Sequence, residues 1–203
     1  MLSATIDKEL VSTFEQEIFT GRIHVVEDSK QLSAALSELR KHKLLGFDTE
    51  TKPCFTKGCR TVVSLLQLST PEDCFLIRLN KLGLTEETKS LLEDKHILKV
   101  GLSIHDDYVS LRRRLPFEAG GFVELQRLCP AYGIRESSLR KVYAIIFSKA
   151  ISKAQQLSNW EAEALSPAQQ RYAALDAWAC LKIYDYLMSL PTPSPVQFAL
   201  LYE

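Results

Sequence analysis

Residues 166–189 read SPAQQRYAALDAWACLKIYDYLMS, and the rest of the chain is organised around this stretch. Ser166 is a preferred N-cap residue, and Pro167 suits the first helical position. Gln169 lies three residues after the cap and completes a capping box. The stretch therefore predicts a long helix that begins at Pro167.

One face of this helix combines a tyrosine and a carboxylate with small and apolar residues. Tyr172 and Asp176 are four residues apart, which places them roughly 40° apart around the helix axis. Burying a carboxylate without a partner is costly, so Asp176 needs a hydrogen bond, a charged partner or a metal ion. Two acidic segments upstream are candidates to share a site with it. The other residues of the face are Ala173, Ala179, Cys180 and Ile183.

The first of these segments ends the apolar run LLGFDTE at residues 44–50. In a strand, residues two apart point to the same side, so Asp48 and Glu50 project together. Two neighbouring carboxylates repel each other unless a cation or a proton lies between them. Acids in this position can equally form the solvated end of a strand, and the motif alone favours neither interpretation.

The second segment is SIHDDY at residues 103–108. Ser103 can cap a helix here, and Asp106 would form a capping-box-like pair with it. This pairing gives Asp106 a structural role and leaves Asp107 as the candidate ligand, with Asp106 as the alternative. Acids in the first turn of a helix also interact favourably with its dipole, so this segment alone favours a structural role.

The apolar runs predict one mixed α/β domain. Three of them, at residues 44–50, 61–69 and 74–77, are joined by short connections and predict an antiparallel meander. A strand at residues 97–102 with a helix on either side predicts a parallel half of the sheet. From residue 120 onward the pattern is mostly helical. The other expected elements are a strand at residues 23–26 and helices after Asp28 and at residues 85–93, 125–132 and 138–147.

Composition and the lack of targeting signals limit the possible binding partners and the expected cellular location. The 203 residues include 25 basic and 25 acidic ones, so attraction to a polyanion must be local. No run of about 18 apolar residues predicts a membrane span, and the N-terminus lacks a signal-peptide pattern. We expect an arm at 1–21, a domain at 22–190 and a tail at 191–203, in a cytoplasmic protein. Reduced thiols are expected at Cys54, Cys59, Cys74, Cys129 and Cys180.

Taken together, the acids predict a metal site. Asp48, Glu50, Asp107 and Asp176 lack basic partners in their motifs and suit two hard divalent cations such as Mg²⁺ or Mn²⁺. Two such ions about 3.5–4 Å apart can activate water and stabilise the leaving oxygen of a phosphodiester. Tyr172 lies one turn from Asp176, where its hydroxyl could orient the attacking water.

Three motifs in this order resemble the tyrosine subgroup of the DEDD superfamily of 3′–5′ exonucleases, which includes ribonuclease D and the Werner-syndrome exonuclease domain. They read GFDTETKP, KVGLSIHDDYVSL and YAALDA, and the approach LSNWEAEALSPAQQ is also similar to the family. The resemblance covers residues 23–190. It implies a ribonuclease H-like fold, two metal ions, and release of nucleoside 5′-monophosphates from a 3′ end.

The resemblance also implies a role for each residue. Asp48 would bridge both ions, Glu50 and Asp176 would hold the nucleophile-side ion, and Asp107 would support the second. Tyr172 would position the water. Substrate contacts are expected near the metals, while Arg112, Arg113 and Arg114 more readily form a solvated face. Phe55 and Trp160 could stack on terminal bases or could equally be packing residues. The expected contacts are Thr49, Lys52, Phe55, Lys153, Trp160 and Arg171.

Two alternatives remain beside the nuclease hypothesis. A non-catalytic nucleic-acid-binding or scaffold module could share the fold, but relatives that lose activity typically lose an acid, and here all four acids and the tyrosine are present. A nuclease specialised for short oligonucleotides would keep the chemistry; a shallow, neutral groove would favour it. The sequence carries no motif that reports contacts to the 2′ hydroxyl, so it does not distinguish DNA from RNA. It names no protein partner.

Overall fold

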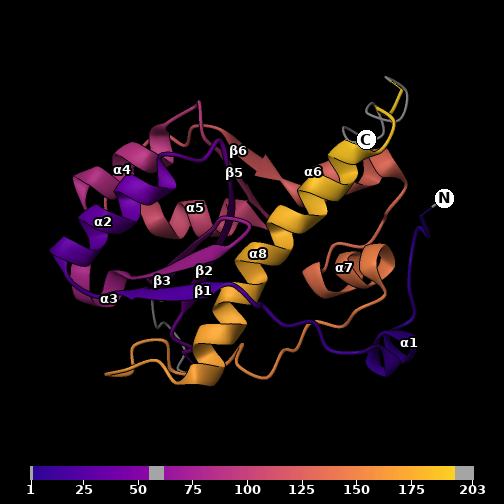
Figure 1. Ribbon diagram of the computed structural model, residues 1–203, viewed down its shortest axis with the longest axis horizontal. Coiled ribbons are helices and arrows are strands. Elements are labelled where there is room, and N and C mark those ends of the chain that lie inside the picture. Colours follow the sequence, from indigo (N-terminus) through magenta and orange to yellow (C-terminus); the bar gives the residue numbers. More distant parts are fainter. Residues whose placement is uncertain (1, 55–61, 195–203) are drawn as a thin grey trace.

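The computed structural model describes residues 2–54 and 62–194 of the chain. In this part of the chain, one six-stranded sheet has the strand order β1-β4-β3-β2-β5-β6, and helices cover both of its faces (Figure 1). The mixed α/β class is therefore confirmed. The strands are β1 (Arg22–Val26), β2 (Leu44–Thr51), β3 (Val63–Ser69), β4 (Asp73–Arg78), β5 (Leu98–Gly101) and β6 (Phe122–Glu124).

The sheet has an antiparallel centre and parallel flanks. β2, β3 and β4 form the predicted antiparallel meander, and β5 pairs in parallel with β2, as expected. β1 adds a parallel edge next to β4. The strand β6 was not predicted, because residues from 120 onward were expected to be mostly helical. It has only three partly buried residues and pairs with β5 alone, so it carries no alternating pattern.

The helices form two layers. The layer made by α2, α4 and α5 packs on one hydrophobic cluster, and α6, α7 and α8 pack on the other. The predicted capping box at Ser166 is found, and Asp28, expected as a cap, also forms a capping box. The helices are α1 (Lys8–Thr13), α2 (Ser29–Leu39), α3 (Leu79–Leu82), α4 (Glu86–Glu93), α5 (Ile104–Arg112), α6 (Leu125–Leu128), α7 (Leu139–Phe147) and α8 (Pro167–Ser189), with a 3₁₀ turn at Cys129–Tyr132.

The long helix α8 crosses the strands diagonally (Figure 1) and lies unusually close to β2. A Cβ atom on Gly46 would lie 2.0 Å from the carbonyl oxygen of Ala177, so only glycine allows this approach. The pleat of β2 sends Leu45 and Phe47 into the opposite cluster. Asp48 and Glu50 consequently project from β2 on the side that α8 covers.

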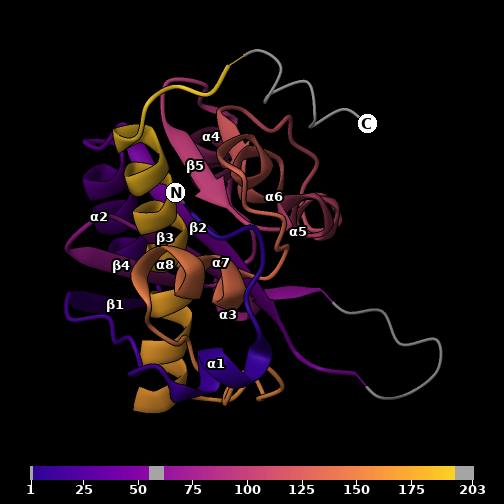
Figure 2. The ribbon, with the colours of Figure 1, turned by 90° about the vertical axis from the view of Figure 1, so that its right-hand side faces the viewer.

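The N-terminal arm is docked against the body of the protein (Figure 2). Gln16 forms an isolated parallel bridge with Ala150, and the amide of Glu17 donates to the Ala150 carbonyl at 2.8 Å. The hydroxyl of Tyr143 in α7 donates to Glu17 Oε2 at 2.6 Å. These contacts hold residues 15–19 beside α7 and the segment that follows it.

The expectation of reduced thiols is correct for Cys74, Cys129 and Cys180, which are buried and free. It is wrong for Cys54, which is disulfide-bonded. Cys59 lies outside the described residues. Within residues 2–54 and 62–194, no helix is both long enough and apolar enough to cross a membrane.

Candidate active site

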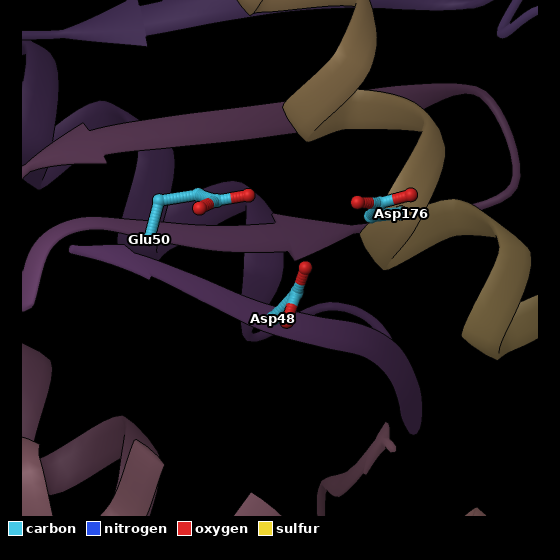
Figure 3. A group of neighbouring side chains, drawn as sticks. All are labelled: Asp48, Glu50 and Asp176. Atoms are coloured by element: carbon cyan, nitrogen blue, oxygen red, sulfur yellow. The ribbon is translucent and has the colours of Figure 1, made fainter. Parts of the chain in front are cut away.

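Three carboxylates from two elements meet at the contact between β2 and α8. Asp48 and Glu50 come from β2, and Asp176 comes from α8 (Figure 3). One carboxylate oxygen of each lies within 4.8 Å of the others. Asp176 is only 7% exposed, and the close approach that Gly46 permits places it opposite Asp48. The structure therefore brings these three predicted acids together.

The three acids are crowded enough to resist ionisation. Burial, followed by the charges of Asp176, Asp107 and Glu50, raises the pKa of Asp48 well above its usual value. Burial, followed by the charges of Asp176 and Asp107, raises the pKa of Glu50 to about 9. Burial raises the pKa of Asp176 to about 7, against a hydrogen bond from Tyr172 and the charge of Lys153. Because ionised carboxylates repel one another here, the site favours the binding of cations.

Tyr172 is tied to this group by its hydroxyl, which hydrogen-bonds with Asp176. Burial and the neighbouring carboxylates raise the pKa of Tyr172, so the phenol stays protonated. The ring of Trp160 packs 6.0 Å from that of Tyr172. Because Trp160 is completely buried, it takes the second of its two expected roles: it packs against Tyr172 and does not stack on a base.

Asp107 lies beside the three-carboxylate group but outside it. Thr49, between Asp48 and Glu50 on β2, donates its hydroxyl to Asp107 Oδ1 at 2.5 Å. Burial raises the pKa of Asp107 to about 7. Its neighbour Asp106 is exposed. The geometry thus favours Asp107 over Asp106 as the acid that faces the site.

The start of α5, which carries Asp107, is not capped as predicted. Ser103 has a left-handed backbone, with φ of 65°, and its side chain makes no capping hydrogen bond. Glu124, at the end of β6, accepts hydrogen bonds from the amides of Ser103 and Ile104 at 2.9 and 2.7 Å. A carboxylate from another element therefore replaces the local cap, and sequence spacing could not show it.

We expect Glu124→Ala to lower the free energy of unfolding by about 1–2 kcal/mol, the usual cost of losing a helix cap. Any activity that depends on Asp107 should fall as well, because α5 carries this residue. Urea unfolding followed by circular dichroism measures the first effect. Glu118→Ala removes an exposed carboxylate, 3.6 Å from Arg112, and serves as the control. Equal stability of the two variants would contradict the capping role of Glu124.

The acids line a cleft of about 350 Å³ that also contains candidate substrate contacts. Lys153 lies on its wall and Arg171 lies on a neighbouring cleft. Lys52 forms an ion pair with Glu161 at 3.4 Å. The carboxylate of Glu161 therefore offsets the positive charge with which Lys52 was expected to contact a phosphate. The hydroxyl of Thr49 is already donated to Asp107. Phe55 lies outside the described residues.

Sequence reasoning did not identify two residues near this cleft. Gln67 faces Asp48 across the β2–β3 pair and is fully buried; neither of its side-chain polar atoms has a hydrogen-bond partner in the described chain. Only its polarity within the apolar run VVSLLQLS marks it in the sequence. Arg140, in the first turn of α7, also lines the cleft, and no sequence signal distinguishes it from other surface arginines.

Residues 23–190 match the model of a 3′–5′ exonuclease family, and the chain belongs to that family. It is 34% identical over 160 residues to exonuclease 3′-5′ domain-containing protein 2 of Drosophila melanogaster, covering 75% of this chain and 27% of that protein. It is 33% identical over 178 residues to the bifunctional 3′-5′ exonuclease/ATP-dependent helicase WRN of Mus musculus, covering 85% of this chain and 12% of that protein. The chain thus spans about a quarter or less of the length of these relatives.

Solved structures show the same fold. The EXO domain of Aedes aegypti Nibbler aligns with a TM-score of 0.73 at 26% identity, covering 88% of this chain and 95% of that one. Escherichia coli RNase D aligns with a TM-score of 0.73 at 22% identity, covering 88% and 45%, which shows a likeness of fold. The predicted ribonuclease H-like exonuclease fold and the resemblance to the DEDD superfamily are confirmed.

Proposed function

We propose that this chain hydrolyses phosphodiester bonds at the 3′ ends of DNA or RNA and releases nucleoside 5′-monophosphates. One observation carries the proposal: Asp48, Glu50 and Asp176 meet within 4.8 Å, with Tyr172 hydrogen-bonded to Asp176, in a cleft of about 350 Å³. The family of the chain supports the same chemistry. Residues 22–190 would form the catalytic domain.

The donor set fits hard divalent cations. Exonucleases of this family use divalent metals, and carboxylate oxygens are the ligands that Mg²⁺ and Mn²⁺ prefer. Within the described chain, no lysine or arginine forms an ion pair with Asp48, Glu50 or Asp176, although the charge of Lys153 acts on Asp176. We therefore assign two Mg²⁺ or Mn²⁺ ions to this site. When bound, they would activate water and stabilise the leaving oxygen.

The protein groups divide the remaining tasks. Asp48 would take part in holding both ions, since it lies in one carboxylate group with Glu50 and Asp176. Glu50 and Asp176 would hold the ion on the nucleophile side, and Asp107 would support the second ion. Tyr172 stays protonated and faces the cleft, where its hydroxyl can hold the attacking water in line with the scissile phosphorus.

The decisive experiment incubates the purified protein with 3′- and 5′-labelled DNA and RNA oligonucleotides, in Mg²⁺, Mn²⁺ or chelator. We expect stepwise shortening from the 3′ end that requires a divalent ion. Mononucleotide products separate this activity from endonuclease cleavage. Binding of the oligonucleotide with no hydrolysis in any metal would favour a non-catalytic module on the same fold.

Tyr172→Phe should lower kcat by roughly 10- to 100-fold, since a positioned proton-handling group contributes on the order of 10²–10⁴. The ring and its packing on Trp160 remain, so the fold should be unaffected. Affinity for Mn²⁺, measured by calorimetry, should change little because the carboxylates are intact. Tyr186→Phe removes a hydroxyl from the same helix, at a ring that packs on Phe147 and lines neither cleft, and is the matched control. A Tyr172→Phe enzyme as fast as the Tyr186→Phe enzyme would exclude the assigned role.

The cytoplasmic location expected from the sequence stays a prediction. Its premise of wholly reduced cysteines does not hold, because Cys54 is disulfide-bonded. Fractionation of cells that express a tagged protein would test the location.

A further inference from the structure

A second cleft adjoins the acidic one. It has a volume of about 440 Å³ and lies between the docked N-terminal arm and the first turns of α8. The two clefts share four wall residues, so they adjoin each other at these side chains. The shared residues are Arg140, Ser152, Lys153 and Tyr172.

The wall of the second cleft carries a surplus of positive charge. Arg140, Lys153 and Arg171 all line it. None of the three forms an ion pair in the described part of the chain, and Arg140 Nε is buried without a hydrogen-bond partner. Glu17 is the acid on this wall, and its charge is offset by the hydroxyl of Tyr143 and by Lys182 at 3.8 Å.

Two other basic residues, by contrast, are paired. Lys52 pairs with Glu161, and Lys141 pairs with Glu136 at 3.0 Å. A guanidinium whose Nε is shielded from water gains a hydrogen bond only when an anion enters the cleft. The cleft also presents Ile18, which is 60% exposed and offers an apolar surface to a base. Cations beside an apolar surface suit a single nucleic-acid strand.

We propose that the second cleft binds the strand on the 5′ side of the scissile bond, and that Arg140 contacts the next phosphodiester. This inference rests on the proposed function of the acidic cleft. A cleft of about 350 Å³ is at the small end of the range for ligand sites and suits one terminal nucleotide. The rest of the strand must extend beyond this cleft, and Arg140 and Lys153, which line both clefts, carry positive charge that attracts phosphate there.

The affinity for the substrate would then depend on the N-terminal arm, which forms one wall of this cleft. The residues of the arm that line it are Gln16, Glu17, Ile18 and Phe19. The inference also favours strands longer than a dinucleotide. A nuclease specialised for the shortest oligonucleotides would have no use for a cationic site beyond the first phosphate.

The test compares Arg140→Gln with Arg113→Gln. Arg113 is an exposed arginine at the end of α5 that lines neither cleft, so it matches the charge change. Affinity for a fluorescent single-stranded oligonucleotide is measured by anisotropy in chelator, where nothing is hydrolysed, at several salt concentrations. We expect Arg140→Gln to weaken binding roughly five- to tenfold. The slope of log affinity against log salt should fall by about 0.7, the value for one phosphate of a single strand.

Turnover of two substrates in Mn²⁺ separates this inference from the proposed function. One is a single-stranded oligonucleotide, and the other is the p-nitrophenyl ester of thymidine 5′-monophosphate, which has no second phosphodiester. Arg140→Gln should raise KM for the oligonucleotide roughly five- to tenfold more than for the ester. If the wild-type protein cleaves neither substrate, the proposed function fails, and the anisotropy result still tests the cleft.

Equal behaviour of Arg140→Gln and Arg113→Gln in both measurements would overturn the inference. So would an equal loss on both substrates, which would place Arg140 at the scissile phosphate. Thermal unfolding checks that the variants fold. If Arg140→Gln is unfolded, Arg171→Gln carries the same test, because Arg171 lies on the exposed surface of α8 and lines only the second cleft.

Discussion

Asp48→Ala is expected to abolish 3′–5′ exonuclease activity, with kcat falling by about three orders of magnitude or more. Asp48 lies in one carboxylate group with Glu50 and Asp176, where it would take part in holding both ions. Each metal ion contributes several kcal/mol of transition-state stabilisation, and each 1.36 kcal/mol corresponds to about tenfold in rate. The loss of a shared ligand should therefore remove most of the catalysis. The measurement is single-turnover hydrolysis of a 3′-labelled oligonucleotide.

Asp106→Ala provides the matched control. Asp106 is an acid of the same type in the same region, but it is exposed and does not face the group. We expect this variant to keep activity within about twofold of the wild-type enzyme, in line with the small effect of surface substitutions. Activity that survives Asp48→Ala, or that is lost equally in both variants, would show that the site is wrongly placed.

The second large effect is a loss of folding stability as the pH rises, which bound metal ions should oppose. The pKa of Asp176 and that of Asp107 are raised to about 7, and that of Glu50 to about 9. A carboxyl group with a raised pKa in the folded state contributes stability below its unfolded value of about 4, and this is lost as the pH rises through the folded value. The metal-free protein should thus lose stability, on the order of a few kcal/mol, between about pH 5 and pH 9.

Divalent ions bind the ionised carboxylates and should oppose this loss. Thermal unfolding in chelator should show Tm falling by several degrees from about pH 5.5 to about pH 8.5. Excess Mn²⁺ should raise Tm at the higher pH and have little effect at the lower one. A Tm in chelator that stays constant or rises over this range would contradict the electrostatic description of the site.

Glu50→Gln isolates the contribution of the acidic group. The substitution keeps the size of the side chain and removes one charge, so the fall in Tm with pH should be smaller. Lys99 has a pKa lowered to about 8 by burial, which adds stability as the pH rises above that value. That contribution is common to both proteins and cancels in their difference. A wild-type and a Glu50→Gln curve of the same slope would exclude Glu50 from the effect.

Local sequence was sufficient for much of the architecture. The caps at Ser166 and Asp28 and the meander followed from residue type and spacing, because capping and strand pairing act over a few residues. The three-residue strand β6 was not predicted, since an edge strand of that length has no periodic pattern of apolar residues. The left-handed backbone of Ser103 was not predicted either, because its amide donates a hydrogen bond to Glu124, 21 residues away.

The sequence by itself identified the residues to which we assign the chemistry: an Asp-x-Glu pair on one strand, an aspartate on a helix, and a Tyr-x-x-x-Asp pair on the last helix. Only the tertiary structure decided how they meet. Gly46 lets α8 approach β2 until Asp176 faces Asp48, and Thr49 selects Asp107 over Asp106 by a hydrogen bond. The physical reason is the distance along the chain over which each interaction acts. Residue type and spacing fix contacts within an element, but distances between carboxylates on different elements depend on how the backbones pack.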